Sequence, residues 1–566
     1  MDTFDYVVIG GGTAGCVLAA RLSQDPGVRV LLLEAGQAEP LPAMSNPAAW
    51  LGLAGTAVDW AYTTVPQRGV DQAVLPWPRG KVLGGSSGIN GMIHVRGDRS
   101  SYDAWETAGA AGWNYEALLP FFKRSEQVVG GDPAYRGMKG PMRISPPATT
   151  DAFWRACFDA AEEVGHTRND DNNGAAAEGV SWIDNNVVDG VRQSAADAYL
   201  APAVHRPNLT VVANARARRL RIEKGTCHGV DYAIDRQART AFAAGEVILT
   251  AGVIGTPQLL LLSGVGPGQH LREVGLDVVA DLPGVGLNLH DHPKSQVAYT
   301  ARQPLGVSQY SRKPLVLMRS DPAGSPDLQT IFVHLLMRPR FTPAQEAGYS
   351  VIFSLMTPAS RGTLRLASAD PTEAPLIDPQ YLAEASDRER MVTGLRRARE
   401  IGSASAMGPW RDRELMPGPD VRTDAALLAY VRQTLTTYYH PVGTCRIGSD
   451  SHSVVDAQLR VRGIANLRVA DASVMPSIVS ANTNAAVLAI AERAASIVTG
   501  ELASRLSPGP ASEHRLFDHQ VALGEAAGPQ PTDVECCAGA VGDSLGDGAG
   551  GGQRMHNTVA TKAGAE

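Results

Sequence analysis

The hydrophobic pattern at the start of the chain predicts a strand, a turn and a helix in quick succession. Residues 6–9 (YVVI) are four β-formers in a row, and the glycine-rich turn GGGTAG follows at 10–15. Residues 16–22 then place apolar side chains on one side of a helix, and residues 28–33 form a second apolar run. Continuous apolar strands are typical of a parallel sheet that is buried on both faces. The pattern therefore predicts an α/β fold that opens with a β-α-β unit.

Later segments add further elements to this unit. Apolar and alternating runs predict strands at 208–220, 245–250 and 330–335 and helices at 258–262, 386–403 and 485–497. The alternation at 330–335 (TIFVHL) favours a second sheet. From about residue 503 the chain is rich in Gly, Ala, Pro and Ser and has little apolar periodicity. Residues 503–566 are therefore predicted to be a disordered C-terminal tail.

The turn at residues 10–15 has the spacing of a dinucleotide-binding fingerprint. Gly10 permits the tight turn, Gly12 lets the backbone approach a pyrophosphate, and Gly15 allows helix and strand to pack closely. Glu34 ends the next strand, at the usual distance of roughly 20 residues, where a carboxylate accepts hydrogen bonds from ribose hydroxyls. The helix N-terminus offers free N–H groups to the phosphates. The fingerprint predicts a bound dinucleotide and leaves NAD and FAD both open.

Composition and charge exclude several classes of protein. The chain has 566 residues, with 51 Lys and Arg against 58 Asp and Glu, a net charge of −7. A mildly acidic chain without a basic block argues against nucleic acid as a main partner. Its apolar runs are far shorter than the ~18 residues that a membrane span needs. The 6 cysteines are scattered, without a CxxC or His/Cys cluster. We therefore predict a cytoplasmic protein with reduced thiols, no membrane span and no metal site.

Five further blocks carry the most specific signal. They are residues 79–92 (RGKVLGGSSGINGM), 252–266 (GVIGTPQLLLLSGVG), 284–292 (GVGLNLHDH), 439–446 (YHPVGTCR) and 467–476 (LRVADASVMP). In sequence and in order they resemble the glucose–methanol–choline (GMC) family of flavoprotein oxidoreductases. Val253 departs from the family pattern, in which a small residue is usual. The resemblance covers the chain from about residue 4 to 500 and leaves the tail uncovered.

The resemblance implies FAD and a two-domain fold. A Rossmann-like FAD-binding domain would be interleaved with a substrate domain built on an antiparallel sheet. The implied boundaries are 1–155, 195–300 and 435–502 for the FAD-binding domain, and 156–194 and 301–434 for the substrate domain. Some relatives attach the flavin covalently through a histidine in the first block, and the matching position here is Ile89, which has no nucleophile. FAD is therefore expected to be bound without a covalent link.

The family motifs also carry cofactor-binding roles onto residues of this chain. The implied set is Gly10, Gly12, Thr13, Ala14, Gly15, Glu34, Val82, Gly85, Asn90, Gly91, Met92, Ala217, Asp471, Ala472 and Asn484. Ala217 matches an adenine-contacting position that is usually Val. A helix that begins near Asn484 would direct its positive end towards the reduced flavin.

Two residues match the catalytic positions of the family, His440 and Asn482. A neutral imidazole suits the removal of a hydroxyl proton because its ordinary pKa, about 6.5, lies near working pH. The Asn482 amide can orient the hydroxyl and stabilise a developing alkoxide. We interpret His94, His290, His292 and His334 as ordinary turn, cap or pocket-wall histidines. Tyr438 and Tyr439 are equally consistent with a pocket wall and with core packing.

The sequence outside the cofactor blocks narrows the range of reactions that this chain could catalyse. Residues 46–50 (NPAAW), 59–62 (DWAY) and 410–415 (WRDREL) resemble the pyridoxine-oxidising branch of the family, with the aryl-alcohol and hydroxymethylfurfural oxidases as close alternatives. That branch has Pro where this chain has Asn482. We therefore predict oxidation of a primary aromatic or heteroaromatic alcohol to an aldehyde, with O2 or another electron acceptor as the oxidant. A choline-type dehydrogenase is the alternative, and a lyase or photodecarboxylase on the same fold is a more remote one.

Overall fold

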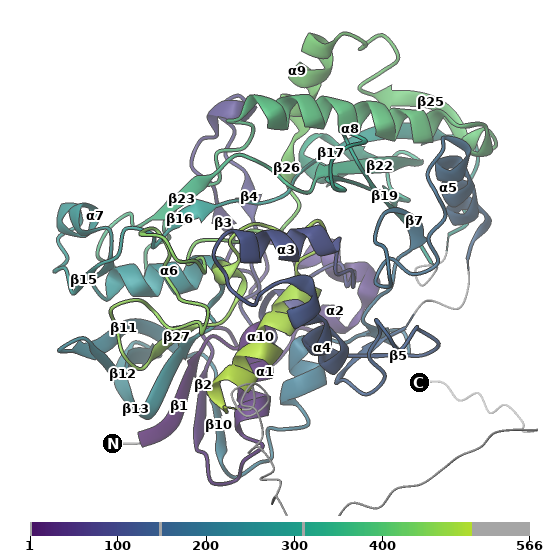
Figure 1. The fold of residues 1–566 in the computed structure, drawn as a ribbon. Coiled ribbons are helices and arrows are strands. Elements are labelled where there is room, and N and C mark those ends of the chain that lie inside the picture. Colours follow the sequence, from purple (N-terminus) through teal and green to yellow (C-terminus); the bar gives the residue numbers. More distant parts are fainter. Residues whose placement is uncertain (1–2, 146–149, 308–311, 501–566) are drawn as a thin grey trace, which may run out of the picture. The chain divides into compact units, whose positions relative to one another are not determined.

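The first strand, β1 (Thr3–Ile9), lies inside a mixed sheet with the order β10-β2-β1-β13-β12-β11. The computed structural model describes residues 3–145, 150–307 and 312–500, and within it β1 pairs in parallel with β2 and β13 (Figure 1). The other strands are β2 (Val30–Leu33), β10 (Leu209–Val212), β11 (Arg216–Glu223), β12 (Thr226–Ile234), β13 (Gln237–Leu249) and β27 (Leu467–Val469), which pairs in parallel with β13. The predicted parallel β-α-β opening is confirmed.

The glycine-rich turn brings the helix α1 (Thr13–Leu22) directly onto this sheet. Gly10 has φ +107°, which favours glycine, and a Cβ on Gly15 would lie 1.8 Å from the carbonyl oxygen of Gly10. Any side chain at Gly15 would therefore force helix and strand apart. Because α1 starts where β1 ends, its N-terminus lies at the carboxyl edge of the parallel strands, the place where ligands bind in such sheets.

A second sheet is antiparallel, with the order β25-β17-β22-β19-β18-β7. Its strands are β7 (Gly179–Trp182), β17 (Pro293–Ala301), β18 (Pro314–Met318), β19 (Leu328–Val333), β22 (Gly348–Leu355), β25 (Arg411–Met416) and β26 (Thr436–Thr437), which pairs with β17. The long helix α8 (Ala385–Ser403) packs on β17 and β22 (Figure 1). The domain boundary predicted at residue 300 falls inside this sheet, since β17 begins at Pro293.

The remaining elements connect and cover the two sheets. The other helices are α2 (Pro42–Ser45), α3 (Arg99–Thr107), α4 (Tyr115–Ser125), α5 (Ala152–Glu163), α6 (Gly252–Leu262), α7 (Gly268–Glu273), α9 (Asp424–Thr434) and α10 (Asn484–Val498). Short ribbons pair β3 (Tyr62–Thr63) with β4 (Pro76–Trp77), β5 (Glu126–Val128) with β6 (Met142–Ile144), β8 (Val187–Val188) with β9 (Val191–Arg192), β14 (Val265–Gly266) with β15 (Ala280–Asp281), β20 (Met337–Arg338) with β21 (Thr342–Pro343), and β16 (Leu287–Leu289) with β23 (Gly362–Arg365) and β24 (Leu376–Asp378). The helices predicted at 386–403 and 485–497 are α8 and α10.

The helices α1 and α10 lie side by side although they come from opposite ends of the described chain (Figure 1). Arg21 of α1 donates two hydrogen bonds, of 2.9 and 2.7 Å, to the buried carboxylate of Glu492 on α10. Tyr199 donates a third, of 2.9 Å, to the same carboxylate. These bonds fix the two helices against each other, and with them the positions of their N-termini.

Three further sequence predictions concern the C-terminal tail, membrane spans and the cysteines. The predicted disorder of residues 503–566 lies outside the described residues. Within the described ranges, no helix is long and apolar enough to cross a membrane. The four described cysteines, which are Cys16, Cys157, Cys227 and Cys445, are all buried and form no disulfide with one another.

Candidate active site

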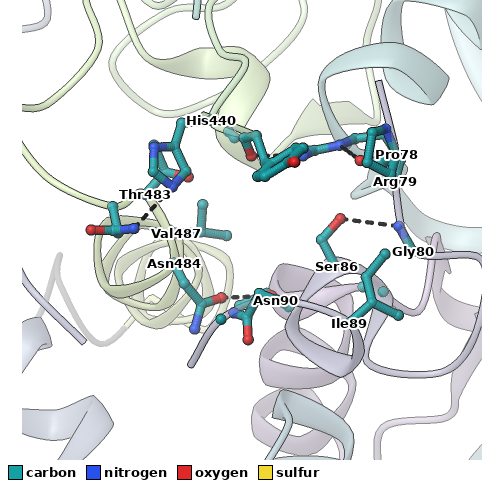
Figure 2. Close-up of a pocket in the computed structure, with 18 of the residues that line it drawn as sticks. Pro78, Arg79, Gly80, Ser86, Ile89, Asn90, His440, Thr483, Asn484 and Val487 are labelled. Carbon is teal, nitrogen blue, oxygen red and sulfur yellow. Dashed lines mark hydrogen bonds between the residues drawn. The ribbon is translucent and has the colours of Figure 1, made fainter. Parts of the chain in front are cut away.

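A single large cavity brings together residues from both sheets. Its volume is about 1050 Å³, at the upper end of the roughly 300–1,000 Å³ of small-molecule and cofactor sites. Its wall includes the turn after β1, the block at 79–92, the start of α6, β17 and the loop before α10. In Figure 2, His440, Asn484 and Asn90 surround one hollow, with Ser86 and Ile89 across the opening. The cavity is therefore large enough for a dinucleotide together with a small substrate.

One end of the cavity has the features that phosphates and a ribose require. A Cβ on Gly12 would meet no atom closer than 4.0 Å, so the space beside its backbone is open. Glu34, at the end of β2, accepts hydrogen bonds from the N–H groups of Gly11 (2.7 Å) and Gly36 (2.6 Å). Burial raises the pKa of Glu34 to about 7. The carboxyl oxygens keep lone pairs for further donors, which is what ribose hydroxyls require.

Two helix N-termini converge on the cavity. Thr13 at the start of α1 and Asn484 at the start of α10 both line it, and the Thr13 hydroxyl donates to Asn484 Oδ1 at 3.0 Å. Each N-terminus carries unpaired N–H groups and a partial positive charge. The two helices therefore favour a ligand that carries one negative charge near the N-terminus of α1 and another near the N-terminus of α10.

Nearly all predicted cofactor residues meet at this cavity. Those that line it are Gly10, Gly12, Thr13, Ala14, Glu34, Gly85, Asn90, Gly91, Met92, Ala217, Asp471, Ala472 and Asn484. Gly15 does not line it but lets α1 approach β1, as described above. Val82 also does not line it, because its side chain packs in a small apolar cluster with Met44, Leu53 and Val58.

Asn90 and Asp471 fix parts of the wall through their own hydrogen bonds. Asn90 Oδ1 accepts from the Met92 N–H at 3.0 Å and from the Arg192 guanidinium at 2.8 Å. The buried Asp471 carboxylate accepts from the Gly252 N–H at 2.8 Å and the Thr256 hydroxyl at 2.7 Å, and so holds the start of α6. Neither side chain is free to move without breaking these bonds.

The two predicted catalytic residues contact each other in the cavity wall. Asn482 Nδ2 lies 3.1 Å from His440 Nε2, and both residues line the cavity. Asn482 Oδ1 is buried and has no hydrogen-bond partner among the described residues. The Asn482 amide is therefore oriented by the contact between its N–H group and His440, and not by its oxygen.

The protonation of His440 is set by a chain of hydrogen bonds that ends at a backbone carbonyl. His292 Nε2 lies 2.9 Å from the Met356 oxygen, which can only accept, so the proton of the neutral ring is on Nε2. His292 Nδ1 therefore accepts from His440 Nδ1, 3.0 Å away. With its proton on Nδ1, His440 presents an unprotonated Nε2 towards Asn482 and the cavity. The arrangement leaves on His440 the lone pair that a general base needs.

Burial keeps both rings neutral. It lowers the pKa of His440 well below its usual range, and the nearby basic groups His292, Arg79 and Lys294 further disfavour a positive charge on this ring. Burial also lowers the pKa of His292 to about 3. The backbone N–H of His440 donates to Asp291 at 2.8 Å, which fixes the loop that carries the ring. His440 is thus a neutral, fixed acceptor at physiological pH.

The part played by His292 differs from the sequence interpretation. The expected role was that of an ordinary turn, cap or wall histidine, and its direct bond to His440 corrects that interpretation. The HDH motif at 290–292 was the available signal, because it places two imidazoles around a carboxylate. His334, by contrast, does line the cavity as a wall residue. Tyr438 and Tyr439 line the cavity too, and Tyr438 is also part of the buried core, so both interpretations hold for Tyr438.

Comparison with known proteins identifies the family. Residues 4–294 match the model of the N-terminal part of the GMC oxidoreductases, and residues 358–491 match the model of the C-terminal part. The chain belongs to the GMC oxidoreductase family. Its cofactor is FAD, and it is a flavin-dependent alcohol oxidoreductase.

Individual GMC oxidoreductases align over almost the whole chain. The mitochondrial choline dehydrogenase of Homo sapiens is 39% identical over 538 residues, which cover 88% of this chain and 90% of the relative. The alcohol dehydrogenase [acceptor] of Pseudomonas putida is also 39% identical, covering 88% of this chain and 95% of the relative. Among solved structures, pyridoxine 4-oxidase from Mesorbium loti has a TM-score of 0.84 at 37% identity and covers 87% of this chain and 98% of that chain.

The residues of this GMC oxidoreductase fit FAD. The open space beside Gly12, the N-termini of α1 and α10, and the acceptor oxygens of Glu34 match the pyrophosphate and ribose of a dinucleotide. Gly91 is a second open position, since a Cβ there would meet only Trp50 at 4.0 Å. These residues would hold the cofactor and leave His440 exposed to a substrate beside it.

Proposed function

We propose that this protein oxidises a primary aromatic or heteroaromatic alcohol to an aldehyde, with His440 as the catalytic base. The observation that carries the proposal is the hydrogen-bond chain from the Met356 carbonyl through His292, which leaves the lone pair on His440 Nε2. A base with that lone pair in a cavity wall is what removal of a hydroxyl proton requires. FAD, when bound, supplies the acceptor for the hydride that leaves the substrate carbon bearing this hydroxyl group.

The roles of the two side chains follow from their donors and acceptors. The substrate hydroxyl donates to His440 Nε2 and takes the place of the Asn482 amide there. The freed Asn482 N–H then donates to the substrate oxygen and stabilises its growing negative charge. His440 ends the step as an imidazolium, with the proton on Nε2, and the carbon that has lost hydride becomes an aldehyde. The cavity wall also has an apolar part, with Ile331, Phe332 and Phe341 suited to an aromatic ring.

Choline oxidation is the second candidate, favoured by the relatives that are choline dehydrogenases and oxidases. A trimethylammonium group is commonly held in a cage of aromatic rings. This cavity has such rings in Phe341, Tyr438 and Tyr439, but the Lys294 ammonium already lies over all three. The Lys294 side chain therefore already occupies the ring faces that a trimethylammonium group would need, and this favours the aromatic alcohol over choline.

The experiment is a panel of alcohols added to the holoenzyme without oxygen, followed by flavin absorbance. Benzyl alcohol and its heteroaromatic analogues are expected to bleach the flavin and to yield one aldehyde per flavin, whereas choline is not. Bleaching by choline alone would favour the second candidate. If none of these alcohols bleached the flavin, oxidation of this substrate class would be excluded, and a lyase or photodecarboxylase activity would be tested next. Readmission of air then separates an O2-dependent oxidase from a dehydrogenase that needs another acceptor.

Replacement of Asn482 tests its assigned role. Asn482→Ala removes the donor to the substrate oxygen, so the rate of flavin reduction should fall by roughly a hundredfold to a thousandfold, the usual loss for one such donor. The FAD content of the purified protein should change little, because the predicted cofactor residues are elsewhere in the cavity. Loss of FAD with a normal reduction rate in the remaining holoenzyme would instead make Asn482 a cofactor-binding residue.

The link to the cofactor is expected to be non-covalent. Ile89 lines the cavity and carries no nucleophilic atom at the position where some relatives have a histidine. Acid precipitation should therefore release the yellow flavin into the supernatant, where its absorbance is measured. Flavin retained in the washed pellet would contradict this expectation and would require an attachment site other than residue 89.

A further inference from the structure

Lys294 is a buried lysine in the wall of the substrate cavity. It lies in β17, lines the cavity, and is only 1% exposed. Its Nζ lies 3.3 Å from the ring centre of Phe341, 4.4 Å from that of Tyr439 and 5.3 Å from that of Tyr438. Ring faces of this kind attract an ammonium group, so the three rings hold the lysine in place. The Tyr438 ring also packs against His440, with ring centres 4.7 Å apart.

This ammonium has no anionic partner in the described part of the chain. No hydrogen bond or ion pair from Lys294 Nζ occurs there, whereas buried charges are normally paired. Asp291 is the nearby carboxylate that favours the charged lysine. Its oxygens, however, already accept from the His440 N–H, the Thr437 hydroxyl and the Tyr381 hydroxyl. Burial lowers the pKa of Lys294 well below its usual range, as expected for a cation that lacks a partner.

Two of the three residues that carry these rings have a strained backbone conformation. Phe341 has φ +61° and Tyr439 has φ +70°, in the left-handed region that side chains other than glycine rarely adopt. Such backbone conformations are energetically unfavourable and cluster at functional sites. The strain is consistent with rings that are positioned for a ligand and not merely for packing.

The charges around the rest of the cavity leave this region positive. The carboxylates in the wall are Glu34 and Asp471, which belong to the predicted cofactor-binding set, and Asp189, which lies in the exposed turn between β8 and β9. A second lysine, Lys313, lines the cavity and lies 5.8 Å from the Trp154 ring centre. An anionic group that reached Lys294 would not be opposed by these three carboxylates, because two belong to the predicted cofactor-binding set and one lies in an exposed turn.

We propose that Lys294 binds the carboxylate of the substrate, so that the substrate is a primary alcohol that also carries an acid group. This proposal rests on the proposed function and narrows its substrate class. The carboxylate would accept hydrogen bonds from Lys294 Nζ, the body of the substrate would lie against the apolar wall, and the hydroxyl would reach His440. The carboxylate stays unchanged while the alcohol loses a proton and a hydride. Choline fails at the same point, because it carries no anionic group that Lys294 could bind.

The test compares matched anionic and neutral alcohols on the holoenzyme. Wild type is expected to have a higher kcat/KM for para-(hydroxymethyl)benzoate than for para-(hydroxymethyl)benzamide. In Lys294→Met the value for the benzoate should fall by roughly tenfold to a hundredfold, the usual loss for a charge-assisted hydrogen bond, while the benzamide changes by less than about threefold. Lys294→Gln, with a shorter polar chain, gives the same comparison if the methionine variant folds poorly. FAD content and Tm report whether each variant folds.

Binding alone supplies a readout that does not depend on turnover. Unreactive benzoate should perturb the flavin spectrum of wild type at lower concentration than benzamide does, and Lys294→Met should remove that difference. Lys313→Met is the matched control and should keep the preference for the anion. Equal response of wild type to both ligands, an equal loss for both in Lys294→Met, or a loss confined to Lys313→Met would each overturn the proposal. Because benzyl alcohol tests alcohol oxidation itself, failure of the carboxylate preference is distinguishable from failure of the proposed function.

Discussion

Replacing His440 with alanine is expected to slow anaerobic reduction of the flavin by an alcohol at least ~10²-fold, the usual loss for a general base. The reason is that Nε2 of this ring carries the lone pair that His292 and the Met356 carbonyl leave unprotonated. FAD should stay bound, because its predicted ligands lie in the turn after β1, in the block at 79–92 and at the start of α10. Stopped-flow absorbance of the holoenzyme measures the reduction rate directly.

A matched histidine separates this effect from a general disturbance of the cavity. His334 also lines the cavity, whereas the bond to Asn482 is made by His440. His334→Ala should therefore change the reduction rate far less than His440→Ala does. If His440→Ala reduced the flavin at a near-normal rate, His440 would not be the base, and the assignment of the pair would have to be abandoned.

The second large effect is expected from Gly12→Val. The space beside Gly12 is open in the protein, with no atom closer than 4.0 Å to a Cβ placed at this residue, so the variant should fold. Its side chain would instead occupy the region where the pyrophosphate meets the N-terminus of α1. Loss of one or two charge-assisted hydrogen bonds corresponds to at least ~10²-fold weaker FAD binding. The measurement is titration of the apoprotein with FAD, followed by flavin fluorescence.

Gly52→Val is the control for this substitution. Gly52 also has no atom within 4 Å of a Cβ, but it does not line the cavity. It should bind FAD as the wild type does. If Gly12→Val bound FAD normally, the pyrophosphate would have to lie elsewhere, and the assignment of the glycine-rich turn would fail.

Much of the nucleotide end could be predicted from sequence because local sequence dictates local backbone there. The apolar run before residue 10, the glycine spacing and Glu34 together favour one local structure, which is a strand, a tight turn and a helix start. The strand β13 was predictable from sequence only over 245–250. Its first half contains polar residues and pairs with β12, and this pairing depends on tertiary context. Extended pairs of that kind leave little periodic signal.

The substrate end was less predictable because its properties arise from contacts between distant residues. Lys294 sits in a run, PKSQVA, that gives no sign of a buried ammonium. The position of Lys294 in the cavity wall can be recognised only in the folded protein, where Phe341 and Tyr439, from two other segments, lie around it. His292 and His440 are likewise separated by 148 residues, so their hydrogen bond could not be read from either motif alone. The family motifs were sufficient to predict which residues form the site. Their protonation states and surroundings could be described only from the structure.

The pH dependence of anaerobic flavin reduction by benzyl alcohol tests the central claim most directly, since that claim is proton removal by a neutral His440. Burial lowers the pKa of this ring below its ordinary value of about 6.5, so the neutral form predominates at every pH above that value. We predict a rate that is flat from about pH 7 upward and falls only in acid, as His440 is protonated. A rate that kept rising between about pH 8 and 10 would require a base of much higher pKa and would contradict proton removal by His440.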